Sequence, residues 1–299
     1  MPKPPPVYNG QFVLRPEQDT SYVHYENADG HPSQPDPASF PRVNVWWLAE
    51  AALLSYWDPA SAVPLFNAAG LDAEFVREGG TDCYVVWQSN WVLVAFRGTE
   101  GDQWSDVLAD AKFAQIPWQV GCVHAGFACA VREIEPKLTQ VLNHLSAGRT
   151  LWFCGHSLGA ALATLAAGLY SGTRGVCTFG SPRIGDRAFS AAFGERFAKR
   201  SLRYVNSHDV VTHVPPPVLV PWHFCHVDPR RFIDQAGRIS SRGPNLAHFF
   251  SDLIGHPRTL LEMVEGFESG VFLHPPKFFL DHMPKAYAIW TWNDYEAHG

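Results

Sequence analysis

The chain has 299 residues, of which 46% are hydrophobic and 17% are charged, so it can bury a sizeable core. Its formal net charge is −6 and it contains no long run of Lys or Arg, which excludes nucleic-acid binding through a basic surface. The first residues, MPKPPPVYNG, contain no apolar stretch typical of a secretory signal. We therefore expect a cytoplasmic protein, with a secreted form that has lost its signal as the alternative.

The first 41 residues differ in composition from the rest of the chain, because they are rich in Pro, Asp, Asn and Ser. We expect residues 1–41 to form an extended arm that packs in part on the body. No internal repeat or linker follows, so residues 42–299 are predicted to form a single domain. The six cysteines show no paired spacing, and we expect no disulfide framework.

Apolar spacing predicts the elements of the first half of the chain. Helical spacing, glycine ends and short apolar runs indicate two helices, three strands and two further helices. In chain order these cover residues 42–56, 62–69, 73–77, 83–88, 91–96, 102–111 and 128–145.

Strands and helices alternate in the middle of the chain, over residues 150–154, 158–170, 175–179, 187–198 and 202–205. This alternation predicts an α/β fold with a mostly parallel sheet, helices on both faces and right-handed crossovers. After residue 209 the pattern changes. We expect a β-hairpin over 222–227 and 231–234, one or two helices over 246–267, and a last segment over 278–292.

One motif stands at the boundary between the strand 150–154 and the Ala- and Leu-rich helix 158–170. It reads Gly155-His156-Ser157-Leu158-Gly159 and is an instance of the G-x-S-x-G nucleophile elbow. A strand that turns into a helix this sharply strains the serine backbone, and side chains at either glycine would collide. The motif also occurs by chance, but its position favours Ser157 as a nucleophile. A transmembrane span over 151–170 is excluded because Gly155, His156 and Ser157 interrupt the apolar pattern.

A serine nucleophile needs a histidine to take its proton and an acid to orient that histidine. In α/β-hydrolases these residues follow in the order Ser, Asp or Glu, His. Asp209 comes directly after the strand 202–205 and precedes two valines, which favours an orienting acid over an ordinary turn residue. His282 is the preferred base because a helix entry there would hold it at the mouth of the site. The alternatives for the base are His248, His256 and His274.

Two further groups complete the expected site. The backbone N–H of Leu158 should form one half of an oxyanion hole, and that of Thr99, after the strand 91–96, the other half. An ordinary polar loop is the alternative reading at Thr99. The cluster of His213, His223, Cys225 and His226 fits no strong zinc pattern, so we expect structural imidazoles and no metal.

Taken in order, these motifs resemble the class 3 lipases, the family of the fungal triacylglycerol lipases. The resemblance extends over roughly residues 42–290. The motifs that carry it are VAFRGT (94–99), WSDV (104–107), VHAGF (123–127), GHSLGAALA (155–163), TFGSPRIGD (178–186), RYVNSHDVV (203–211) and, less sharply, Asp281-His282.

The resemblance implies an α/β-hydrolase with Ser157 as nucleophile, Asp209 as orienting acid and His282 as base. Thr99 and Leu158 become the oxyanion donors, and no cofactor is required. It makes His124 and His226 structural, and it places the loop 180–183 beside the site in a supporting role.

The implied activity is hydrolysis of carboxylic esters of lipids, as in a triacylglycerol lipase or esterase. A phospholipase or an acyltransferase with the same triad, and an inactive lipid-binding protein, are the alternatives. Residues 100–120 correspond to a lid that opens at a lipid interface, with a plain surface helix and loop as an equal reading.

Overall fold

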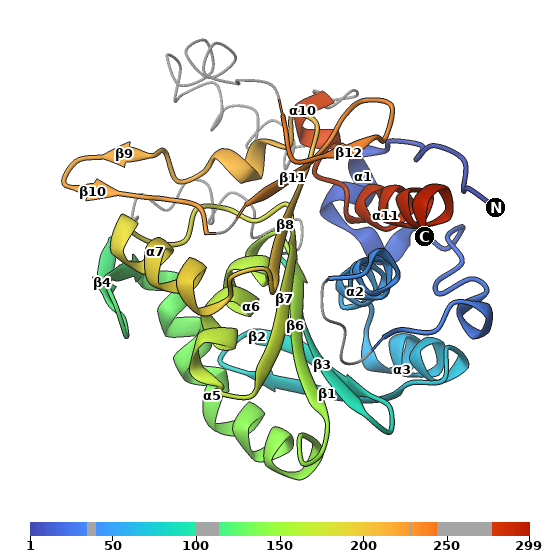
Figure 1. The fold of residues 1–299 in the computed structure, drawn as a ribbon, viewed down its shortest axis with the longest axis horizontal. Coiled ribbons are helices and arrows are strands. Elements are labelled where there is room, and N and C mark those ends of the chain that lie inside the picture. The colour runs from blue at the N-terminus through green and yellow to red at the C-terminus, as the bar shows by residue number, and fades with distance from the viewer. Residues whose placement is uncertain (35–39, 100–113, 228, 244–276) are drawn as a thin grey trace.

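The computed structural model describes residues 1–34, 40–99, 114–227, 229–243 and 277–299 (Figure 1). The helices predicted over 102–111 and 246–267 lie outside these residues, as do most of the predicted lid and His248, His256 and His274. None of the helices in the described part of the chain has the length and the continuous apolar character that crossing a bilayer requires.

A central sheet of eight strands runs through the described residues in the order β1-β2-β3-β6-β7-β8-β11-β12. Its strands are β1 Asp72–Glu78, β2 Thr81–Trp87, β3 Trp91–Phe96, β6 Thr150–His156, β7 Thr173–Phe179, β8 Ser201–Asn206, β11 Arg230–Ile233 and β12 Ile239–Ser240. The five strands from β3 to β11 are parallel to one another, and the flanking strands are antiparallel. The α/β prediction is confirmed: the middle of the sheet is parallel and buried.

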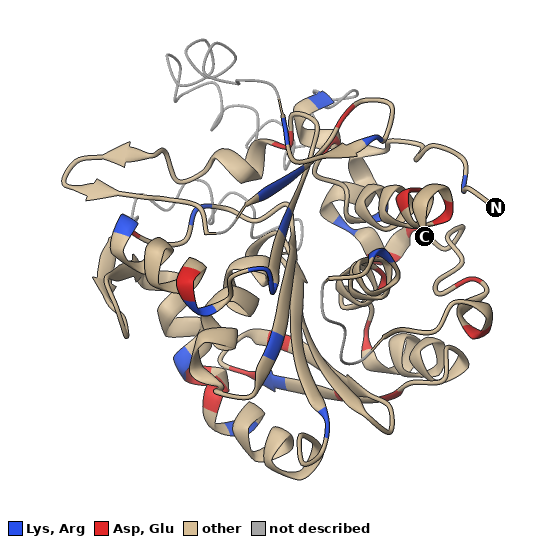
Figure 2. Cartoon of the chain, viewed as in Figure 1, with Lys and Arg blue, Asp and Glu red and all other residues tan. Residues whose placement is uncertain are grey.

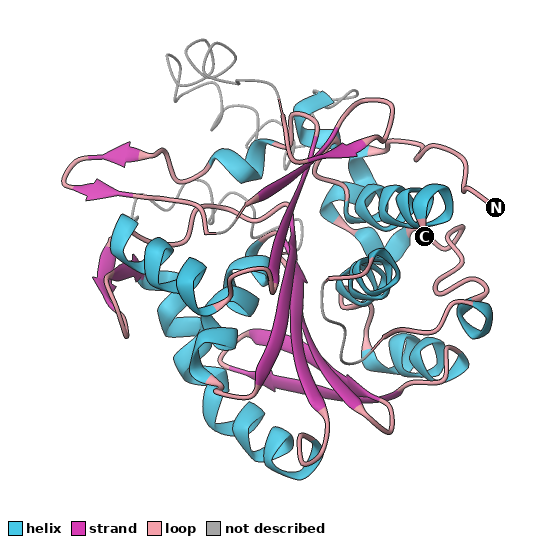
Figure 3. Ribbon diagram, viewed as in Figure 1, coloured by secondary structure: helices cyan, strands magenta, loops and turns pink. Residues whose placement is uncertain are grey.

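Helices cover both faces of this sheet (Figure 3). One face carries α2 Arg42–Leu54, α3 Pro59–Ala68 and α11 Pro284–His298, and the other carries α5 Ala125–Leu145, α6 Leu158–Leu169 and α7 Arg187–Arg196. Each layer encloses its own apolar core. The Trp46 and Trp292 rings meet between α2 and α11 at a centroid distance of 4.6 Å. The small side chains of α6 are buried all round, which lets this helix lie close to the sheet.

The N-terminal segment lies along the layer of α2 and α11 (Figure 1). It contains short helical turns: α1 Gly10–Leu14, η1 Pro16–Gln18 and η2 Ala28–Gly30. Val13 and Tyr25 are buried against the body. Asp19 forms an ion pair with Lys285 in the first turn of α11. These contacts join the segment to the helix that follows His282.

The predicted hairpin between residues 222–227 and 231–234 is wrong. β10 Trp222–His223 pairs with β9 Val218–Leu219 instead, and β11 joins the central sheet beside β8. The physical reason is burial, because Phe232 and Ile233 of β11 are apolar and fill the sheet core, whereas the proline-rich run before β10 folds back on itself. A further pair of short strands is β4 Gln115–Pro117 and β5 Cys122–His124.

Candidate active site

Ser157 lies in the sharp turn between β6 and α6. Its backbone has φ 59° and ψ −129°, a conformation that non-glycine residues rarely adopt and that costs on the order of 1–3 kcal/mol. Its N–H donates to the carbonyl oxygen of Phe179, at 3.0 Å. A side chain at Gly155 would overlap the backbone of Gly159, and one at Gly159 would overlap the carbonyl of Phe96. The strain and the collisions expected of an elbow are therefore both present.

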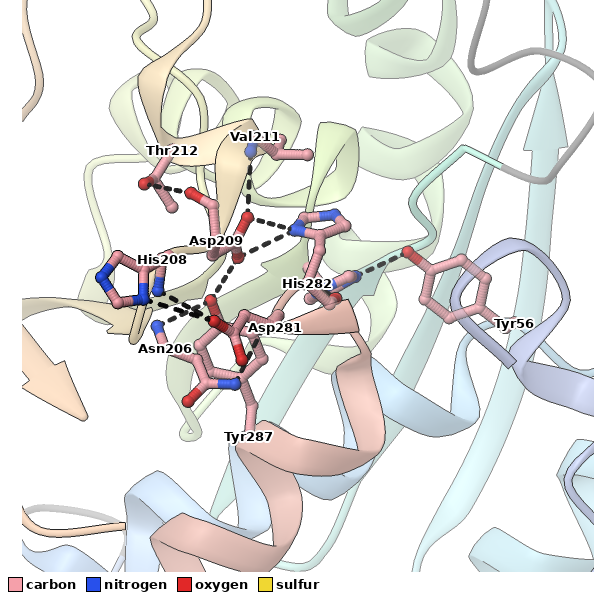
Figure 4. Close-up of polar contacts among 10 residues, drawn as sticks. Tyr56, Asn206, His208, Asp209, Val211, Thr212, Asp281, His282 and Tyr287 are labelled. Atoms are coloured by element: carbon pink, nitrogen blue, oxygen red, sulfur yellow. Dashed lines mark hydrogen bonds and ion pairs between the residues drawn. The ribbon is translucent and has the colours of Figure 1, made fainter. Parts of the chain in front are cut away.

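The predicted acid and the predicted base meet in a buried pair (Figure 4). Asp209 follows β8, and its Oδ1 accepts the N–H of Val211 at 3.0 Å, which caps the turn η4 Val210–His213. His282 lies between α10 Lys277–Leu280 and α11. Its Nδ1 lies 2.7 Å from Oδ1 and 2.8 Å from Oδ2 of Asp209, and neither side chain is exposed. Because a carboxylate only accepts, Nδ1 carries the proton and Nε2 is the nitrogen that can act as a base.

Tyr287 of α11 fixes the other side of the carboxylate. Its hydroxyl donates to Asp209 Oδ2 at 2.5 Å and accepts the backbone N–H of Asn206 at 3.0 Å. Burial first, and the charge of Asp209 second, raise the pKa of Tyr287 well above its usual range, so the hydroxyl keeps its proton and stays a donor. Sequence reasoning missed this residue, since no local pattern surrounds it.

The end of β7 lies between Ser157 and the Asp209–His282 pair. Gly180, directly after β7, has φ +60°, and a Cβ there would lie 2.7 Å from Asp209 Oδ2 and 2.9 Å from His282 Cε1. Phe179, the residue before it, holds the backbone N–H of Ser157. The carboxyl ends of the adjacent strands β6, β7 and β8 thus gather the three predicted residues at one edge of the sheet, where α/β proteins place their sites.

His156 anchors the elbow to the histidine loop. Its Nε2 lies 2.8 Å from the carbonyl oxygen of His282, which can only accept, so Nε2 donates and Nδ1 accepts the hydroxyl proton of Tyr56 at 2.8 Å. The imidazole rings of His156 and His282 lie 4.3 Å apart. Tyr56 also fills the space beside Gly98, where any side chain would overlap its hydroxyl. One buried tyrosine, again without a sequence signal, therefore joins the predicted oxyanion loop, the elbow and the base.

The two predicted oxyanion donors come from segments that touch. Gly159 in the first turn of α6 packs against the backbone of Phe96 and Arg97, and Thr99 is buried two residues further on. Asp82 holds this loop, because its carbonyl accepts the N–H of Arg97 at 3.0 Å and its carboxylate lies 3.3 Å from the Arg97 guanidinium. The oxyanion roles of Thr99 and Leu158 stay predictions.

Three further histidines of the sequence analysis, His124, His213 and His226, are described by the structure and lie outside the Asp209–His282 pair. His124 caps α5 and stacks on Phe127 at 4.2 Å. Burial, followed by nearby arginines, lowers the pKa of His213 to about 3 and that of His226 well below its usual value. Within the described ranges, no three His, Cys, Asp or Glu residues gather as metal ligands.

The neutral state of His156 predicts a pH dependence of stability. Burial first, and His282 second, lower the pKa of His156 well below 6.5, so the unfolded chain binds this proton more readily than the folded one. The contribution of His156 to the free energy of unfolding is fully present above about pH 6.5. Below that pH it falls by up to about 1.4 kcal/mol per pH unit. Urea unfolding can be measured at about pH 7.5 and about pH 5.5, on either side of the usual histidine pKa. Between these two values the free energy of unfolding should fall less for His156→Gln than for the wild type. Equal losses in the two proteins would contradict the assignment.

Known proteins share the segment that carries Ser157 and Asp209. The family model described as lipase (class 3) matches residues 93–219, from β3 through Ser157 and Asp209 to β9. Over this segment the chain is similar to the class 3 lipase family. Thr99 and Leu158 lie within the class 3 lipase match, whereas His282 lies beyond it and rests on the geometry alone.

Two curated relatives and one solved structure illustrate the similarity. The chain is 31% identical over 198 residues to phospholipase A1-II 1 of Oryza sativa, covering 56% of this chain and 49% of the relative. It is 30% identical over 178 residues to lipase ZK262.3 of Caenorhabditis elegans, covering 53% and 48%. The chain thus spans about half the length of the curated relatives it matches. The mono- and diacylglycerol lipase of Aspergillus oryzae superposes with a TM-score of 0.55 at 20% identity, covering 65% and 80%, which shows that the two share an α/β-hydrolase-type fold.

Proposed function

We propose that the protein is a serine hydrolase that cleaves carboxylic esters of lipids through an acyl-enzyme on Ser157. One observation carries this proposal: the strained serine lies at the same sheet edge as a buried Asp209–His282 pair whose Nδ1 is oriented by the carboxylate. A buried, fully oriented imidazole beside an elbow serine is the arrangement that nucleophilic acyl transfer needs.

In the proposed reaction, the Ser157 hydroxyl attacks the acyl carbonyl while His282 Nε2 takes its proton. The negative charge that develops on the carbonyl oxygen is stabilised by the N–H groups of Thr99 and Leu158 and by the positive end of α6. His282 then gives the proton to the departing alkoxide as the carbon–oxygen bond breaks. A water molecule, deprotonated by His282, releases the acid and restores the serine. These steps use only groups of this chain and water.

The proposed substrates are acylglycerols or other lipid acyl esters. This choice is supported by the class 3 lipase match and by relatives named as phospholipases and lipases. A phospholipase A1 activity is the second candidate, favoured by the rice relative. An acyltransferase would use the same acyl-enzyme with another alcohol in place of water, and an inactive lipid-binding protein would carry the same fold without turnover.

The proposal is tested by the wild-type protein on a series of p-nitrophenyl esters from acetate to palmitate, on emulsified triacylglycerol and on phosphatidylcholine. We expect turnover, and we expect a fluorophosphonate probe to label Ser157 and no other serine. The preferred substrate separates lipase from phospholipase. A protein that hydrolyses none of these esters and does not react with the probe would overturn the hydrolase proposal in favour of lipid binding.

A further inference from the structure

Two short hairpins project from the same side of the molecule (Figure 1). In the first, β9 and β10 pair through Leu219–Trp222 and Val218–His223, with a turn at Val220. In the second, β4 and β5 are joined by the turn 118–121. The Gln115 side chain of β4 donates to the carbonyl oxygen of His223 of β10 at 2.7 Å, so the two hairpins form one ledge.

The tips of this ledge expose large apolar side chains to solvent. Val220 is 88% exposed, Val218 58% and Val120 51%. The other exposed large hydrophobic residues in the described part of the chain lie in the N-terminal segment: Met1, Val7 and Val23. We call Val120, Val218 and Val220 the valine tips. Water contact with three such side chains at neighbouring loop ends is unfavourable unless something covers them.

The segments that form the ledge carry no charged residue of their own, although the Arg132 guanidinium of α5 lies over the Trp118 ring and donates to the carbonyl oxygen of Pro117. Residues 114–131 and 210–227 contain no Asp, Glu, Lys or Arg, and Figure 2 shows both hairpins free of either charge colour. The tips themselves therefore offer no charged side chain for an ion pair with a partner. The apolar tips match a partner that is itself uncharged and apolar at the contact.

The backbone of the first hairpin argues against another protein strand as that partner. Pro215, Pro216, Pro217 and Pro221 flank the short β9–β10 pair and have no N–H to offer, which disfavours strand addition by a second copy or a peptide. The hairpins project from the body (Figure 1), which suits insertion of their tips into a fluid layer. Furthermore, η4 leads from Asp209 into this hairpin, so the hairpin continues the segment that carries Asp209.

We propose that the valine tips insert into the apolar layer of an uncharged lipid surface and hold the protein there. The proposal deepens the proposed function, because it names the surface on which that site would meet its substrate. Apolar insertion of this kind depends on buried area and little on salt, unlike recruitment by anionic headgroups.

The test is co-flotation with vesicles of pure phosphatidylcholine, carried out in the Ser157→Ala background so that the lipid stays intact. Val218→Asp/Val220→Asp should lower the partition onto vesicles by about tenfold or more, because two apolar anchors become charges. The matched control is Val7→Asp/Val23→Asp, which changes two valines of 78% and 60% exposure elsewhere on the surface. The control should bind as the parent does, and added salt should leave binding unchanged.

Three results would overturn the proposal: no vesicle binding by the parent, equal binding by the tip variant, or an equal loss in the control variant. The outcome is separate from that of the proposed function, since flotation needs no turnover. With Ser157 intact, the tip variant should keep the wild-type rate on soluble p-nitrophenyl acetate and lose activity on emulsified ester only. A protein that binds vesicles but hydrolyses nothing would keep this inference and lose the hydrolase proposal.

Discussion

Ser157→Ala should lower kcat for ester hydrolysis by about 10³-fold or more, because the variant has no nucleophile to form the acyl-enzyme. The substitution leaves the contacts that bind the ester and the proposed oxyanion donors unchanged, so KM should change far less than kcat. The measurement is initial rates on p-nitrophenyl butyrate together with fluorophosphonate labelling. Ser201→Ala is the matched control, since Ser201 is similarly buried but lies at the start of β8, at the far end of that strand from Asp209, and should retain most of the activity.

The same assay identifies the base. His282→Ala should lose kcat nearly as far as Ser157→Ala, and Asp209→Asn should lose about 10⁴-fold because it destroys the orientation of the imidazole. Substitution of His248, His256 or His274 should leave the rate near that of the wild type. If His282→Ala stayed active while one of those variants failed, the base would be that other histidine. If Ser157→Ala kept its activity, the nucleophile would lie elsewhere.

The second large effect is on stability. Gly159→Ala should lower the free energy of unfolding by about 3 kcal/mol or more, since its new methyl group would overlap the backbone of Phe96 and Arg97 rather than a movable side chain. Relief requires α6 to move away from β3, which would also displace the elbow. Urea unfolding followed by circular dichroism gives the change, with an unchanged slope as the sign of a two-state comparison.

Gly194 of α7 offers the control, because it lies in a helix and a Cβ there would meet no atom within 4 Å. Gly194→Ala should therefore stabilise the protein by about 0.5–1 kcal/mol through the better helix propensity of alanine. If the free energy of unfolding changed equally in the two variants, the structure would accommodate a methyl group at Gly159 without a penalty, and this prediction would be wrong.

The sheet and the elbow could be predicted because their signals are local. Short apolar runs separated by turns indicated β1, β2, β3, β6, β7 and β8, and the paired glycines around Ser157 indicated the sharp turn. Asp209 could be found because it directly follows a buried strand. The pairing of β11 could not be predicted. A strand of four residues can join either the sheet or a hairpin, and the outcome depends on which surface buries its apolar side chains.

Tyr56 and Tyr287 show the limit of sequence reasoning at the site. Tyr56 contacts His156 across 100 positions of the chain, and Tyr287 contacts Asp209 across 78. Nothing near either tyrosine distinguishes it from a core aromatic residue. Their importance comes only from where the packing of α2 and α11 places their hydroxyl groups.

The packing of α11 against α2 also has a consequence for the order in which the site is completed during synthesis. Ser157 and Asp209 leave the ribosome well before His282 and Tyr287, and chains are made from the N-terminus onward. Until α11 has emerged and docked on α2, Asp209 lacks its contacts with the His282 imidazole and the Tyr287 hydroxyl, and the base proposed for Ser157 is absent. On the proposed mechanism, a nascent chain would carry a nucleophile that it cannot yet use, and ester hydrolysis would begin only once α11 has docked on α2.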